Sequence, residues 1–154
     1  GTSSSSTGWS WGKFNTQLRT DKAKVGFTTT ATSAEGQILW FKGSGPNNHV
    51  GLEITSSTAT LYTMLNGTRT DRASVSVSSA GASYEIRYDP STKVFSVWRN
   101  GGQIGSWTDS SNVAPTGLGN RYGGIGLHGT RSGFIFISFE KANPIDDWSL
   151  ADVA

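Results

Sequence analysis

Two tryptophans occupy strand positions where a polar side chain is expected. Trp40 and Trp98 alternate with Phe41 and Val97 in apolar-polar patterns, and successive side chains of a strand point to opposite faces. If Phe41 and Val97 face a core, both indoles face outward. A flat indole packs against the C–H face of a sugar, and burying ~80–100 Å² in this way contributes about 2–2.5 kcal/mol. The pattern favours a carbohydrate-binding face; packing at a sheet edge, or a core position for Trp98, is the alternative.

Polar side chains that suit sugar hydroxyls share the outward parity or lie in neighbouring turns. Lys42, Glu53 and Glu85 have the same parity as the tryptophans. Amide, guanidinium, imidazole and phenol groups all bond to hydroxyls, although Asn in a turn also has a purely conformational explanation. The candidate carbohydrate-binding residues are Trp40, Trp98, His49, Asn48, Arg87, Arg121 and Tyr122.

The carboxylates do not form a catalytic pattern. Glu53 and Glu85 each stand alone in their segments. They could meet across strands at the ~5–5.5 Å that a retaining glycosidase uses, but nothing in the spacing requires it. Neither His49 nor His128 is accompanied by a Gly-x-Ser-x-Gly nucleophile motif. We therefore expect no catalytic residues and no enzyme activity.

Metal and cofactor motifs are similarly weak. The chain has no cysteine and two histidines, which disfavours a zinc site. The best oxygen-ligand cluster for calcium is 109–112 (Asp-Ser-Ser-Asn), which is also an ordinary turn sequence. The glycine-rich run 117–123 lacks the strand-turn-helix context of a nucleotide-binding loop. We expect no metal and no cofactor, with calcium left open.

Composition indicates one all-β domain. Of 154 residues, 34% are hydrophobic and 11% aromatic, with 20 Gly; aromatic residues are depleted in disordered chains. The formal charge of +2 is scattered, which does not favour a nucleic-acid partner, and no apolar run approaches ~18 residues, so no membrane insertion is expected. Residues 1–8 are interpreted as a flexible linker or a cloning remnant, and residues 9–154 as a single β-sandwich domain.

Strand signals recur at even spacing and are separated by turn residues. Asn66-Gly67 and Asn100-Gly101-Gly102 are hairpin turns, and no segment shows a helical period. This succession of short strands and turn residues predicts an antiparallel two-sheet β-sandwich. The expected strands are 25–31, 37–42, 49–55, 60–66, 72–78, 83–88, 94–99, 103–108, 123–128, 134–140 and 145–150. Trp9 and Trp11 would share one face of an edge strand.

A family resemblance appears in the second half of the chain. The run YEIRYDPSTKVFSVWRNGGQIGSWTD (84–109), followed by GLGNRYGGIGLHG (117–129) and IDDWSLAD (145–152), resembles concanavalin A-like (laminin G-like) jelly-roll domains. Within that superfamily it is most similar to modules of minor tail and receptor-binding proteins of actinobacterial phages. The resemblance covers about residues 35–152, and the opening GWSWGKFNTQL lacks the usual Asp-Asn-Phe-Asn-like start.

The resemblance implies a jelly roll that binds glycans on a sheet face or at its rim loops. We interpret the chain as a non-catalytic glycan-binding module, a phage tail adhesin that contacts host cell-surface polysaccharide, located on the virion tail or outside cells. A weak site, at best ~4 kcal/mol, would act through copies in a homo-oligomer or larger tail assembly. The alternatives are a structural or protein-docking tail module without a ligand, and a secreted polysaccharide-active enzyme or its carbohydrate-binding module.

Overall fold

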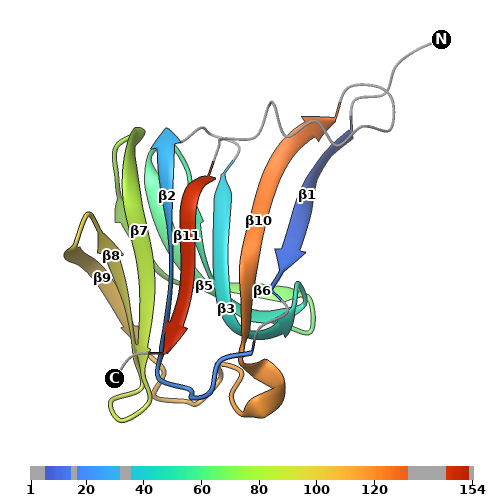
Figure 1. The fold of residues 1–154 in the computed structure, drawn as a ribbon, viewed down its shortest axis with the longest axis vertical. Helices are drawn as coiled ribbons and strands as arrows, with labels where there is room; N and C mark the ends of the chain where they lie inside the picture. The colour runs from blue at the N-terminus through green and yellow to red at the C-terminus, as the bar shows by residue number, and fades with distance from the viewer. Residues whose placement is uncertain (1–5, 15–16, 32–35, 132–144, 153–154) are drawn as a thin grey trace.

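The computed structural model describes residues 6–14, 17–31, 36–131 and 145–152, and these form two antiparallel β-sheets (Figure 1). The six-stranded sheet has the spatial order β1 (Ser6–Lys13), β10 (Tyr122–Arg131), β3 (Gln37–Gly45), β4 (Asn48–Ile54), β5 (Thr58–Leu65), β6 (Thr68–Ser76). The five-stranded sheet has the order β11 (Ile145–Asp152), β2 (Ala23–Ala31), β7 (Ala80–Asp89), β8 (Val94–Arg99), β9 (Gly102–Thr108). The expected two-sheet sandwich is confirmed.

Helix is limited, in the described ranges, to one 3₁₀ turn, η1 (Leu118–Asn120), between β9 and β10. No helix in those ranges is long and apolar enough to cross a membrane. The connection that carries η1 also carries the Asp109 turn, so the two sheets are joined there by a long loop rather than a tight hairpin.

Several strand boundaries differ from the expected ones, and the differences are largest at two places. β6 begins at Thr68, because Asn66 and Gly67 adopt φ values of 50° and 78° and complete the turn alone. β1 begins at Ser6 and pairs with β10, so it includes residues 6–8, which were expected to be linker. Backbone pairing needs no apolar side chain, which is why a Ser-Thr-Gly run can extend the strand. The expected strand 134–140 lies outside the described residues.

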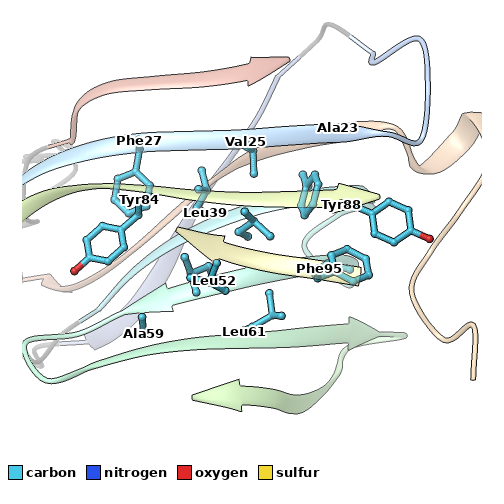
Figure 2. Packing of buried hydrophobic residues seen from close by; sticks show 14 of the residues in the cluster. Ala23, Val25, Phe27, Leu39, Leu52, Ala59, Leu61, Tyr84, Tyr88 and Phe95 are labelled. Carbon is cyan, nitrogen blue, oxygen red and sulfur yellow. The ribbon is translucent and has the colours of Figure 1, made fainter. Parts of the chain in front are cut away.

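The core lies between the two sheets (Figure 2). On β7, Tyr84, Ile86 and Tyr88 are buried, whereas Glu85 and Arg87 between them are partly exposed. The same alternation places Phe95 of β8 against Phe41 of β3, with ring centroids 5.9 Å apart in an edge-to-face arrangement. The facing assignments predicted from alternation are therefore confirmed for these core residues of both sheets.

Lys42 is an exception to the predicted parity. Its φ of 46° turns the side chain away from the outer face, at the point where the pairing of β3 with β4 shifts register. The ammonium lies 4.3 Å from the centroid of the Tyr88 ring and 3.2 Å from Asp21 Oδ1, and the side chain is 1% exposed. Burial lowers the pKa of Lys42, while the Asp21 charge opposes that shift. Lys42 therefore fastens the loop that precedes β2 and takes no part in an outer-face site.

Candidate functional site

The two tryptophans singled out by parity lie on opposite sides of the sandwich. Trp40 is on β3, in the six-stranded sheet, and Trp98 is on β8, in the five-stranded sheet. Both point away from the core cluster between the sheets, as predicted. Because each sheet has its own outer face, the two rings cannot line one groove.

Trp40 faces outward but is not accessible. It pairs with Gly124 of β10, and a Cβ built on Gly124 would lie 2.6 Å from Trp40 Cζ2, so the indole lies across β10 in the space left by that glycine. The residue is 0% exposed, and its indole N–H has no acceptor among the described residues. The expectation of an open Trp40 ring is wrong, because parity alone does not reveal which neighbouring strand leaves room for the ring.

The outer face of the six-stranded sheet carries a second apolar cluster, which we call the aromatic layer. Tyr62 lies over Gly51 just as Trp40 lies over Gly124, because a Cβ on Gly51 would be 2.4 Å from Tyr62 Cζ. His49 sits among the rings, with centroids 5.5 Å from Trp11, 5.4 Å from Trp40 and 5.5 Å from Tyr62. The aromatic layer comprises Ile38, Trp40, His49 and Tyr62, which are buried, and Trp11, Met64 and Tyr122, which are partly buried.

His49 joins the aromatic layer to the backbone through two hydrogen bonds. Its Nδ1 lies 3.1 Å from the carbonyl oxygen of Gly45 and must donate to it, so Nε2 accepts the hydroxyl proton of Tyr62 at 2.9 Å. Burial lowers the pKa of His49 from 6.5 to about 4, and burial raises the pKa of Tyr62. Both groups are therefore neutral near pH 7, and they hold each other in place.

A charged cluster, which we call the Arg69 clamp, covers Tyr62. Arg69 on β6 donates from Nη1 to Glu53 Oε2 on β4 at 2.5 Å and from Nε to Asp71 Oδ1 at 2.7 Å. To reach Glu53 it crosses β5, and its guanidinium carbon lies 4.3 Å from the centroid of the Tyr62 ring. Burial alone would lower the pKa of Arg69, but the bonds to Asp71 and Glu53 raise it. The clamp is defined as Arg69, Glu53 and Asp71.

The Arg69 clamp leaves donors and acceptors available at the surface. Arg69 Nη2, Glu53 Oε1 and Asp71 Oδ2 have no partner among the described residues. The side chains of Arg69, Glu53 and Asp71 are 33%, 19% and 61% exposed, so solvent reaches all three. In the same cross-strand row as Glu53, Thr60 and Ser74 pair their hydroxyls at 3.0 Å. Fixed donors beside fixed acceptors are what a polyhydroxylated ligand requires.

Trp98 lies on a more open face but is covered by an arginine. The Arg87 guanidinium carbon is 4.0 Å from the centroid of the Trp98 ring, and Trp98 Nε1 donates to Ser96 Oγ at 2.8 Å. Arg87 is itself held by Glu85 at 2.8 Å. A hollow of about 360 Å³ opens beside them, lined by Lys22, Arg87, Tyr88, Asp89, Thr92, Val94, Ser96 and Gln103. Trp98 and Arg87 therefore lie together, as parity suggested, but apart from the other candidates.

The remaining candidates serve mainly to position loops. Asn48 Oδ1 accepts the backbone N–H of Asn66 at 3.0 Å and so ties two hairpin turns together. Arg121 binds Asp21 at 3.2 Å, and Tyr122 lies beneath the ammonium of Lys13, 3.8 Å from its ring centroid. Of the seven predicted residues, Trp40, His49 and Tyr122 come together in the aromatic layer.

The catalytic and calcium alternatives find no supporting geometry. Glu53 and Glu85 lie on opposite outer faces, so the carboxylate pair left open above does not form. The carboxylate of Asp109 accepts the backbone N–H groups of Val113 and Ala114 at 2.8 Å each, which is the turn role. No three His, Cys, Asp or Glu side chains gather as a metal site in the described parts of the chain.

Arg69, Asp71 and Tyr62 were not identified as site residues from the sequence. The Asn66-Gly67 turn was recognised, and a two-residue turn pairs Leu65 with Thr68 and Met64 with Arg69. That register would have placed Arg69 beside His49 and Met64 on the outer face. The same register places Asp71 opposite Tyr62, so the turn was a sufficient signal for both residues. The bulge on β6 lies beyond this pair and brings Ser74, rather than Ala73, opposite Thr60.

The fit of Tyr62 over Gly51 can be tested with one methyl group. We expect Gly51→Ala to lower the free energy of unfolding by about 1–3 kcal/mol, because the new Cβ would overlap a ring that packing and His49 hold fixed. Gly45→Ala is the control, since a Cβ there meets nothing within 4 Å. Denaturant unfolding measures both, and equal stability of the two variants would contradict this arrangement.

The buried neutral His49 predicts a pH dependence of stability. The unfolded chain protonates this group below about pH 6.5 and the folded protein only near pH 4, so its stabilising effect is complete above pH 6.5 and declines as the pH falls towards 4. The loss is about 3 kcal/mol at 1.36 kcal/mol per pKa unit. Unfolding free energies across this range should show a smaller decline for His49→Asn than for the wild type; an identical decline would contradict the assignment.

Solved structures of low sequence identity share the fold. A carbohydrate-binding module, CBM66 from Bacillus subtilis, aligns with a TM-score of 0.57 at 13% identity over 95% of this chain and 93% of that one. Sheep galectin-11 aligns at 0.51 and 9% identity, over 83% and 94%, and the Caenorhabditis elegans galectin LEC-6 at 0.50 and 9%, over 81% and 91%. No curated protein matches the sequence. A family match covers residues 9–154, and the chain belongs to the family described as Domain of unknown function (DUF7257).

Proposed function

We propose that this protein is a non-catalytic glycan-binding module whose site is the Arg69 clamp on the outer face of the six-stranded sheet. The observation that carries the proposal is an arginine fixed by two carboxylates above a buried tyrosine, with unused donors and acceptors facing solvent. This moves the site away from Trp40 and Trp98, where the sequence analysis had placed it, and keeps the function proposed there.

The chemistry of the clamp matches a sugar better than an apolar or a purely anionic ligand. A hydroxyl both donates and accepts, so it can accept from Arg69 and donate to Glu53 or Asp71 at the same time. Hydrogen bonds to charged groups are stronger than neutral ones. Since the guanidinium is already held at Nε and Nη1, binding does not have to order a long side chain, which reduces the entropic cost.

Apolar surface for the C–H groups of a sugar is available next to the clamp. Met64 is the cross-strand partner of both Arg69 and His49, and it is partly buried in the aromatic layer with Trp11. A sugar ring that rests on this edge while its hydroxyls meet the clamp would bury apolar area and satisfy polar groups together. Beneath it, Tyr62 and His49 support the site without touching the ligand.

The structural comparisons favour the same class of ligand. One similar structure is named a carbohydrate-binding module and two are named galectins. At 9–13% identity these are parallels in fold only, and the proposal for this chain rests on the clamp. Glu53 and Asp71, the carboxylates of the proposed site, are each bonded to Arg69, which is consistent with binding a glycan without cleaving it.

The finer part of the proposal concerns where the glycan is found. The resemblance of about residues 35–152 to modules of phage minor tail and receptor-binding proteins leads us to propose a host cell-surface polysaccharide as the ligand, and the virion tail or the extracellular space as the location. A single small site binds weakly, so several copies on one particle would supply the avidity. Labelling of intact host cells by a multivalent, fluorescent form of the protein would test this part separately.

Substitution of Arg69 tests the proposed site. On an array of purified levan, mannan, xylan, arabinogalactan and peptidoglycan, we expect Arg69→Ala to weaken binding about 10- to 100-fold, the loss of a charged hydrogen bond of about 1.5–3 kcal/mol. Arg69→Lys should also weaken it, because an ammonium lacks the planar fork. Arg72→Ala is the matched control, since Arg72 on the same strand bonds Thr63 and lies against Trp107.

The same array separates the alternatives. Retained binding in Arg69→Ala together with a loss in Trp98→Ala would overturn the clamp and move the site to the opposite face. No binding of the folded wild-type protein to any polysaccharide would overturn the glycan proposal and favour a docking module. Melting temperatures of all variants confirm that a binding loss is not unfolding; exposed ion pairs such as those of Arg69 contribute little to stability.

A further inference from the structure

We infer that the Arg69 clamp selects neutral glycans that present two adjacent free hydroxyls, and that it discriminates against anionic ones. The inference rests on the proposed function and names the ligand class of that same site. It follows from three properties of the clamp: its net charge, the hydrogen bonds that its guanidinium already makes to carboxylates, and the donors and acceptors that remain without a partner.

The clamp carries more negative than positive charge. Two carboxylates, Glu53 and Asp71, share one guanidinium, so the cluster has a formal charge of −1. Asp71 is the most exposed of the three and stands at the sheet edge, on β6. Lys13, a cation on the same sheet, is on β1 at the opposite edge and lies over Tyr122. An anionic ligand would therefore meet a net negative surface.

The guanidinium has no free fork for an anion. Carboxylates, sulfates and phosphates are best bound by two parallel N–H groups of one arginine. In the clamp, Nε is bonded to Asp71 and Nη1 to Glu53, so each pair of adjacent nitrogens that could bind an anion already has one member bonded to a carboxylate. An anion that bound through such a pair would share that nitrogen with Glu53 or Asp71 or displace it, and would bring two negative charges together.

The groups that remain are one donor group and two acceptors. Arg69 Nη2 is bonded to neither carboxylate, and Glu53 Oε1 and Asp71 Oδ2 are the carboxylate oxygens that Arg69 does not hold; none of the three has a partner among the described residues. Two adjacent hydroxyls can accept from Nη2 and donate to the two carboxylates, so that every proton is used. A single isolated hydroxyl can meet the donor and one acceptor only. The paired hydroxyls of Thr60 and Ser74 lie in the same cross-strand row as Glu53 and place neutral polar groups beside it.

The test compares the binding of two derivatives of one polysaccharide that differ in charge. A neutral polysaccharide that binds the wild-type protein is converted into carboxymethyl and hydroxyethyl derivatives with equal degrees of substitution, so both lose the same hydroxyls and differ in charge. We expect the wild type to bind the hydroxyethyl derivative at least 10-fold more tightly at low ionic strength. Periodate treatment, which cleaves the carbon–carbon bond between adjacent hydroxyls, should abolish binding of the parent polysaccharide.

One variant and one control link the preference to the clamp. Asp71→Asn removes a negative charge at an exposed position, and we expect the preference for the neutral derivative to fall at least three-fold. Asp89→Asn changes the net charge of the chain equally but lies on β7, in the other sheet, and should leave the preference unchanged. An equal effect of both variants would mean that only net charge matters and would overturn the inference.

The outcomes distinguish this inference from the function on which it rests. Equal or tighter binding of the carboxymethyl derivative by the wild type, or retained binding after periodate treatment, would overturn the ligand class and leave glycan binding intact. Failure of the folded wild-type protein to bind any polysaccharide would overturn the proposed function, and the ligand class with it. Melting temperatures of Asp71→Asn and Asp89→Asn check that both variants are folded.

Discussion

The close fit of aromatic rings over glycines on the outer face of the six-stranded sheet is the constraint on which the proposed site depends. A ring can lie flat across a neighbouring strand only where that strand has no Cβ, and Gly51 and Gly124 provide this beneath Tyr62 and Trp40. The sheet therefore buries apolar side chains on both faces, in the core on one side and in the aromatic layer on the other. Most antiparallel sheets keep one face polar, so a second buried face calls for an explanation.

The aromatic layer explains why a surface arginine can be precisely placed. A surface ion pair usually contributes little, because two long side chains must be ordered to form it. Arg69 instead lies on a ring that is itself fixed by Gly51 below it and by the hydroxyl bond to His49. The buried neutral pair of His49 and Tyr62 thus supplies rigidity to a charged group that remains in contact with solvent. The aromatic layer therefore fixes the position of the Arg69 guanidinium and adds little to the energy of its ion pairs.

Sequence reasoning predicted the parts of this structure that depend on local pattern. Alternation around Ile86 and Val97 predicted which side chains enter the core, and the Asn66-Gly67 turn predicted the hairpin joining β5 to β6. It failed for Trp40, whose burial depends on a glycine far along the chain. It also failed for Lys42, where a left-handed residue at a register shift reverses the side chain. Parity identifies a face of a sheet, but tertiary pairing decides what covers that face.

Two of the arginines that lie against aromatic rings, Arg87 and Arg69, show what separates a surface contact from a prepared site. Arg87 lies on Trp98 and is held by Glu85 of its own strand, so the position of its guanidinium is fixed by two strands, β7 and β8. Arg69 is held by carboxylates of β4 and β6 above a ring of β5, so three adjacent strands converge on it. Tyr62 is wholly buried and bonded to His49, whereas Trp98 is partly exposed and its indole N–H bonds to Ser96 of its own strand. A ligand that needs a fixed donor beside fixed acceptors finds them at Arg69, because the sheet itself sets their spacing.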